Sequence, residues 1–196
     1  MSELQSELLI GLYGPSRSGK DSIAKFLVQD FGFTQRNMAD TIRNILLDMN
    51  PFLQDSGGEF WRLQDLFKYC GHNWDEIKAQ STDSVDLMIG LGQACRDHLD
   101  YDIWLNTVLK DRPNRLCIAD VRQPNEYHAI KARGGLIWKV VRPGTEKRGM
   151  DGLLDGYDFD VFIENRGPLS DLRGQVQATI SSYIHGMYIQ KNDFLK

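Results

Sequence analysis

The chain has little cysteine and no long apolar run. Among its 196 residues are three cysteines, Cys70, Cys95 and Cys117, which lie far apart and form no C-x-x-C pair. This pattern argues against a disulfide scaffold or a cysteine-based zinc site, and it fits a reducing compartment. Segment 1–7 has none of the features of a signal peptide, and no apolar run approaches the roughly 20 residues that span a bilayer. We therefore expect a cytoplasmic protein with no membrane partner.

The chain also lacks a large excess of charge of either sign. It has 23 lysines and arginines against 27 aspartates and glutamates, a net charge of −4. Such a surface does not attract polyanions non-specifically, so we do not expect nucleic acid as a partner. Any bound anion must be held by a local cluster of donors. With 41% hydrophobic and 26% charged residues, the composition is that of an ordinary globular protein.

Short apolar runs alternate with amphipathic segments along the chain. Buried strands are predicted at residues 8–14, 33–38, 115–120, 136–141 and 161–163. Helices are predicted at residues 22–31, 40–49, 124–133 and 169–189. This alternation predicts the α/β class, with three αβα layers around a parallel sheet. We expect one domain over 1–196, with a helical insertion at about 50–110 and a glycine-rich lid loop at about 142–156.

The middle of the chain reads as mostly helical. One apolar stripe contains Phe60, Leu63, Leu66 and Phe67, and a second contains Val85, Met88, Ile89 and Leu91. Both stripes have helical spacing and are expected to pack in a core. The polar stretch 71–84 is compatible with either a loop or a frayed helix.

A glycine-rich segment directly follows the first predicted strand. Its sequence, GPSRSGKD from Gly14 to Asp21, fits the pattern G-x-x-x-x-G-K. Glycines let the backbone curl so that successive N–H groups surround an anion, and the following helix adds its N-terminal dipole. We expect ATP to bind here, with the Lys20 charge at its phosphates. The candidate ATP-binding residues are Gly14, Ser16, Arg17, Ser18, Gly19, Lys20, Asp21 and Ser22.

Asp21 stands where this motif usually has serine or threonine. A carboxylate is a hard oxygen ligand that can hold Mg²⁺ directly or through water. An acidic residue also stabilises the first turn of a helix. Both interpretations of Asp21 stay open.

Charged residues follow the later predicted strands. Asp120 ends the run 115–120, and as a strand-end acid it is either a second Mg²⁺ ligand or a turn residue. Arg122 follows it, and Arg142 ends the next strand. Lys147 and Arg148 lie in the loop beyond. Phosphoryl transfer between two phosphates concentrates negative charge, which positioned arginines neutralise. This pattern favours an enzyme that uses a phosphate group as the acceptor.

Several segments together resemble the deoxynucleoside monophosphate kinases of tailed bacteriophages. The matching segments, in chain order, are Arg17–Asp21, Leu91–Gln93, Asp102–Trp104, Asp120–Gln123, Asn125–Glu126, Gly134–Gly135, Val140–Gly144 and Ile163–Asn165. The match spans nearly the whole chain and is weak between about 49 and 85. The lysine–aspartate pair in the loop also looks like that of phosphomevalonate kinases.

The resemblance implies a P-loop kinase that uses ATP and Mg²⁺ to convert dNMPs to dNDPs for dNTP supply. It implies that Lys20 and the loop contact the ATP phosphates, that Asp21 holds the metal, and that Arg122 and Arg142 lie at the transfer site. Asp120 stays a candidate metal ligand because of its place at the end of a strand. Arg148 would be a lid residue. The helical insertion would hold the acceptor nucleotide. The candidate acceptor-binding residues are Asp40, Arg96, Asp120 and Arg122, with Trp61 and Lys68 as further candidates. Such an enzyme would lie in the host cytoplasm if phage-encoded.

Two alternatives to this function stay open. One is a related small-molecule kinase that acts on dephospho-coenzyme A or phosphomevalonate. The other is a switch that binds ATP without transferring phosphate. The sequence does not specify the base preference or the oligomeric state, and a homodimer is compatible with it.

Overall fold

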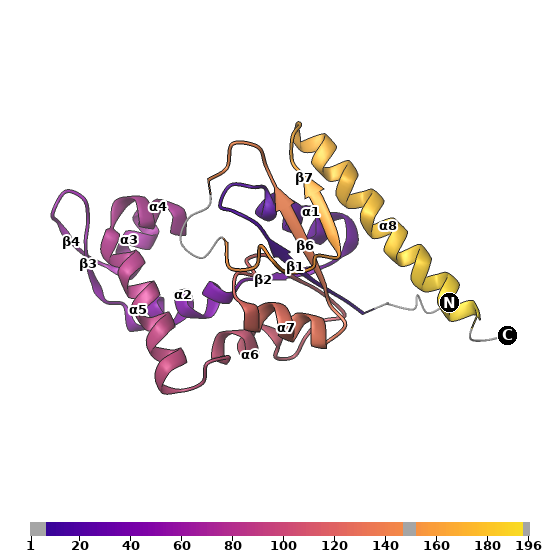
Figure 1. The fold of residues 1–196 in the computed structure, drawn as a ribbon. Helices are drawn as coiled ribbons and strands as arrows, with labels where there is room; N and C mark the ends of the chain where they lie inside the picture. The colour runs from indigo at the N-terminus through magenta and orange to yellow at the C-terminus, as the bar shows by residue number, and fades with distance from the viewer. Residues whose placement is uncertain (1–6, 147–151, 194–196) are drawn as a thin grey trace. The chain divides into compact units, whose positions relative to one another are not determined.

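Residues 7–146 and 152–193 are described in the computed structural model of the chain (Figure 1). The chain divides into two compact units. The first comprises Met1–Asn37 and Asp111–Lys196, and the second comprises Met38–Lys110. The predicted helical insertion, at about 50–110, falls within the second unit.

A five-stranded sheet forms the centre of the first unit, and its strand order is β2-β5-β1-β6-β7. Every neighbouring pair in it is parallel. The strands are β1 (Leu8–Tyr13), β2 (Thr34–Arg36), β5 (Arg115–Ile118), β6 (Leu136–Val141) and β7 (Val161–Glu164). β1 is buried along its whole length, which explains why it reads as a continuous apolar run.

Helices cover both faces of this sheet. On one face, α1 (Lys20–Phe31) and α8 (Leu169–Asp193) pack against Leu8, Ile10 and Leu12 of β1 (Figure 1). On the other face lies α7 (Pro124–Ala132), whose Ile130 approaches Gly11 so closely that a Cβ there would lie 2.9 Å from the isoleucine. The predicted α/β class, with a parallel sheet between two helical layers, is confirmed.

The second unit contains α2 (Met38–Met49), the strands β3 (Phe52–Gln54) and β4 (Phe60–Arg62), and four further helices. These helices are α3 (Leu63–Tyr69), α4 (Trp74–Gln80), α5 (Thr82–His98) and α6 (Ile103–Leu109). Its core gathers the buried side chains Ile42, Leu46, Leu53, Leu63, Leu66, Ile77 and Trp104. In the described part of the chain, no helix is both long enough and apolar enough to cross a membrane.

Two expectations for the second unit were wrong, and the open choice at 71–84 is decided in favour of a helix. Phe60 belongs to strand β4, which pairs antiparallel with β3, and its side chain is 70% exposed. Ile89 is 66% exposed on α5, because this helix buries the small residues Ser84 and Gly92 instead. The polar stretch 71–84 contains the ordered helix α4, which begins where the Asn73 side chain accepts from Asp75 N at 2.9 Å.

Candidate active site

The glycine-rich segment connects the carboxyl end of β1 to the start of α1. Two of its glycines have positive φ, +153° at Gly14 and +111° at Gly19. A Cβ at Gly14 would lie 2.2 Å from Val140 O, and one at Gly19 would lie 2.6 Å from Asn165 Nδ2. Because neither position has room for a side chain, the loop packs directly on the ends of the neighbouring strands.

Lys20 begins α1 and folds back over its own loop. Its Nζ donates hydrogen bonds to Gly14 O at 2.5 Å and to Pro15 O at 2.7 Å, and the residue is only 9% exposed. Ser18 is fully buried in the same loop, and its N–H donates to Pro15 O at 3.2 Å. The loop therefore combines a fixed cation with the N–H groups at the start of α1, which point along the helix axis toward the loop.

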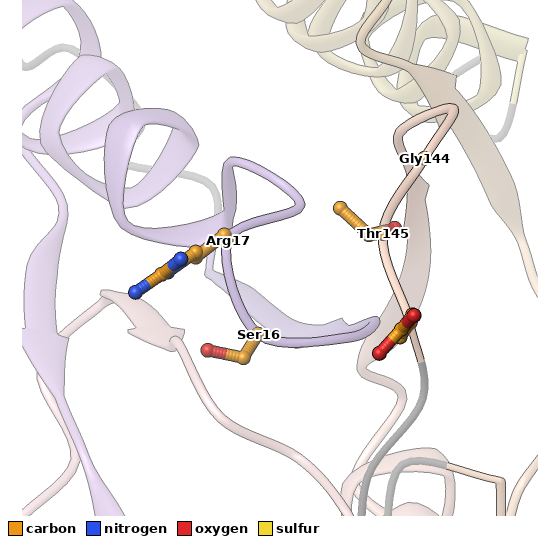
Figure 2. Close-up of a pocket in the computed structure, with 5 residues that line it drawn as sticks. Ser16, Arg17, Gly144 and Thr145 are labelled. Carbon is orange, nitrogen blue, oxygen red and sulfur yellow. The ribbon is translucent and has the colours of Figure 1, made fainter.

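A cavity of about 370 Å³ opens beside the loop. Ser16 and Arg17 line one side of it, and Gly144 and Thr145, which follow β6, line the other (Figure 2). Glu146 completes the lining. A second cavity, of about 340 Å³, is lined by Tyr13, Pro15, Lys139, Val141, Arg142, Thr145 and Asp155. Both volumes lie in the range of small-molecule sites.

Asp120 and Arg122 lie where the chain leaves β5 and enters α7. Val121 N donates to Leu12 O at 3.1 Å, which extends the pairing with β1 beyond the end of β5. The buried carboxylate of Glu126 accepts from Arg122 N at 2.7 Å and from Gln123 N at 3.1 Å. With Pro124 in the first turn, this capping box fixes the backbone at Arg122.

Arg142 follows the last residue of β6 and begins a tight turn. Its carbonyl accepts from Thr145 N at 3.2 Å and from Thr145 Oγ1 at 2.7 Å. Because Arg142 and Pro15 line the same cavity, the arginine and the loop border one space.

The structure places one group of predicted residues at the edge of the sheet that is formed by the carboxyl ends of its strands. These residues are the loop from Gly14 to Ser22 together with Asp120, Arg122 and Arg142. Since the chain leaves β1 toward the face of α1 and leaves the adjacent β5 toward the face of α7, this edge is a topological switch point, where α/β sheets bind ligands. Asp21 is exposed in the first turn of α1.

The remaining predicted residues lie elsewhere in the chain. Asp40 on α2 pairs with Arg43 at 3.0 Å, and Arg96 lies in the last turn of α5, so both belong to the second unit. Trp61 also belongs to the second unit, where its Nε1 donates to Asp55 at 2.9 Å. Lys68 lies in the last turn of α3. Arg148, with Lys147, falls outside the described residues.

Sequence reasoning missed several polar residues around the loop. Lys139 Nζ lies 3.3 Å from Asp155 Oδ1, to which Tyr13 Oη donates at 3.1 Å. The signal was present, since Lys139 is the one charged residue in the otherwise apolar strand LIWKVV. Asn165, which directly follows β7, was named only within the matching segment Ile163–Asn165 and given no role; its side-chain amide donates to Ser18 O at 2.9 Å.

No family model matches the chain. The chain is 28% identical over 192 residues to a protein of Acanthamoeba polyphaga mimivirus described as a "Putative deoxynucleotide monophosphate kinase", with 89% of this chain and 97% of that protein covered.

Two solved structures have a weak likeness to the chain. One is shikimate kinase from Aquifex aeolicus, with a TM-score of 0.45, 12% identity, and 91% of this chain and 99% of that one covered. The other is TT1252 from Thermus thermophilus, with a TM-score of 0.40, 14% identity, and 90% and 98% covered.

Proposed function

We propose that this protein is an ATP-dependent kinase that phosphorylates deoxynucleoside 5′-monophosphates to diphosphates. The observation that carries the proposal is a phosphate loop with a fixed lysine, which borders the same cavity as Arg142. A loop of this kind binds polyphosphate, and an arginine beside it suits an acceptor that is itself a phosphate. The name of the mimivirus relative supports the choice of acceptor.

In this proposal the loop holds the donor. Lys20 and the N–H groups at the start of α1 contact the β- and γ-phosphates of ATP, where the helix dipole adds to the attraction. Arg122 and Arg142 neutralise the charge that builds up between donor and acceptor. The acceptor phosphate is already ionised, so no strong general base is required.

Mg²⁺ would be held by Asp21 and Asp120. The described residues contain no group of three or more histidine, cysteine or acidic side chains that could form a metal cage. Such a cage is not needed in phosphoryl transfer, where Mg²⁺ is usually held by one or two carboxylates together with substrate phosphates and water. Held there, the metal would supply positive charge that neutralises the phosphates during transfer. The roles of Asp40, Arg96 and Arg148 at the acceptor and the lid stay predictions.

A panel of acceptors tests the proposal. ATP and Mg²⁺ are incubated with the enzyme and with dGMP, dTMP, dCMP, dAMP, dephospho-coenzyme A or phosphomevalonate, and ADP release is measured. We expect turnover with at least one dNMP, and a kcat/KM at least about 100-fold lower for the variant Lys20→Met. Turnover with only dephospho-coenzyme A or phosphomevalonate would replace the proposed acceptor. ATP binding without turnover of any acceptor would favour the switch.

A further inference from the structure

The side chain of Asn165 links the last strand of the sheet to the phosphate loop. Its Nδ2 donates to Ser18 O at 2.9 Å across 147 residues of sequence, and the residue is 7% exposed. We propose that Asn165 is a positioning residue, which holds the loop in the conformation that binds phosphate. This inference rests on the proposed function only in naming ATP as the ligand of the loop.

The hydrogen bond from Asn165 to Ser18 O also sets the direction of the Gly19 N–H. A peptide unit is planar and trans, so its C=O and N–H point in opposite directions. The carbonyl of Ser18 and the N–H of Gly19 belong to one such unit. With the carbonyl held by Asn165, the N–H of Gly19 is directed away from Asn165. In the proposed arrangement this N–H is one of the donors that surround the anion.

Asn165 is itself held firmly. Its N–H donates to Val141 O at 2.8 Å, which adds one bond beyond the last paired residue of β7, Glu164. A Cβ at Gly19 would lie 2.6 Å from Asn165 Nδ2 and 3.4 Å from Leu172 of α8. The loop thus rests on a strand end and a helix, and the amide that orients it has little freedom to move.

This arrangement has an energetic consequence for binding. Donors that already point at the place of the ligand need no reorganisation when the ligand arrives. Without the Asn165 amide, the peptide between Ser18 and Gly19 is free to rotate, and the Ser18 carbonyl is left buried without its donor. We expect ATP affinity to fall by about tenfold, the size of effect that follows from losing one hydrogen bond and its preorganisation.

The experiment compares Asn165→Ala and Asn165→Asp, the second of which keeps the size of the side chain and removes the donor at neutral pH. Amide hydrogen exchange of the peptide that contains residues 15–20 is measured by mass spectrometry, and the Kd values of ATP and inorganic tripolyphosphate by calorimetry. The control is Gln175→Ala. The side-chain amide of Gln175 donates to Glu164 O at 3.0 Å, so this variant removes another hydrogen bond at the end of β7. Tm values identify variants that are merely less stable.

We expect faster exchange in the loop and about tenfold weaker binding of both ligands by the Asn165 variants, and neither effect in the control. Unchanged loop exchange in both Asn165 variants would overturn the inference. If the unmodified protein bound neither ATP nor tripolyphosphate, the proposed function would fail. Loop exchange would then still decide whether Asn165 orients the loop.

Discussion

Lys20 Nζ donates to the carbonyl oxygen of Gly14 at 2.5 Å, so the charged end of the lysine is bound within the loop that it belongs to. The carbonyl dipoles of the loop stabilise a cation that is only 9% exposed. An arriving phosphate therefore meets a lysine that is already in place.

Replacing Lys20 should remove turnover and leave the fold intact. We expect Lys20→Met to lower kcat/KM by about 100-fold or more, because a single preorganised donor at a developing charge contributes that much in other enzymes. Steady-state kinetics with the preferred acceptor measure the loss. Lys25→Met is the matched control, since Lys25 is exposed on the same helix. Equal losses in the two variants would contradict a specific role for Lys20.

Replacing Gly19 and Gly174 by alanine should change the free energy of unfolding in opposite directions. Gly19→Ala places a Cβ 2.6 Å from Asn165 at a φ of +111°, and we expect it to lower the free energy of unfolding by about 1–3 kcal/mol. Gly174 lies in α8 with nothing within 4 Å of its Cβ position, so Gly174→Ala should raise that free energy by about 0.5–1 kcal/mol. Urea denaturation measures both values. A Gly19→Ala variant as stable as the parent would show that the loop can move away from Asn165.

Arg122 should act on the chemical step more than on ATP binding. Its backbone is fixed by Glu126, and its position after Asp120 puts it at the proposed transfer site. We expect Arg122→Ala to lower kcat by at least about tenfold, with a smaller change in ATP affinity. Arg133→Ala serves as the control, because Arg133 is exposed at the opposite end of α7. An unchanged kcat would show that Arg122 lies away from the reacting phosphates.

An ion pair between α1 and α8 should make stability depend on pH. Arg173 Nε donates to Asp30 Oδ2 at 2.8 Å, and this hydrogen bond holds the pKa of Asp30 below its ordinary value. A lowered pKa stabilises the fold above the unfolded-state value of about 3.9, and this contribution is lost as pH falls through the folded-state pKa. We therefore expect Asp30→Asn to have a lower Tm than the parent at pH 7, and a smaller difference at about pH 3, below the unfolded-state pKa.

The difference should also shrink in 1 M salt, because the pair lies at the surface. Asp48→Asn, which changes an exposed acid on α2, is the control and should alter Tm little at either pH. A Tm difference for Asp30→Asn that is as large at about pH 3 as at pH 7 would mean that the carboxylate charge is not its source.

The spacing of apolar residues along the chain predicted the strands and helices of the first unit, but it was misleading for parts of the second unit. β6 was predicted with its observed bounds, since a buried parallel strand is a continuous apolar run. Phe60 was assigned to a helix because its spacing to Leu63 and Leu66 is helical. In the structure Phe60 pairs across a hairpin with Gln54, a non-local contact that spacing along one segment does not reveal.

The sequence by itself determined the alternation of strands and helices and the position of the phosphate loop, because both depend on neighbouring residues. Lys20 and the glycines around it are recognisable within eight positions, from Gly14 to Asp21. The tertiary structure alone decided which distant residues meet that loop. Asn165 is 147 residues from Ser18 in sequence, yet the two are hydrogen-bonded. This is possible because β7 is the outermost strand next to β6, and the carboxyl ends of β7 and β1 lie on the same side of the parallel sheet. Strand order arises from the packing of whole layers, which no local pattern encodes.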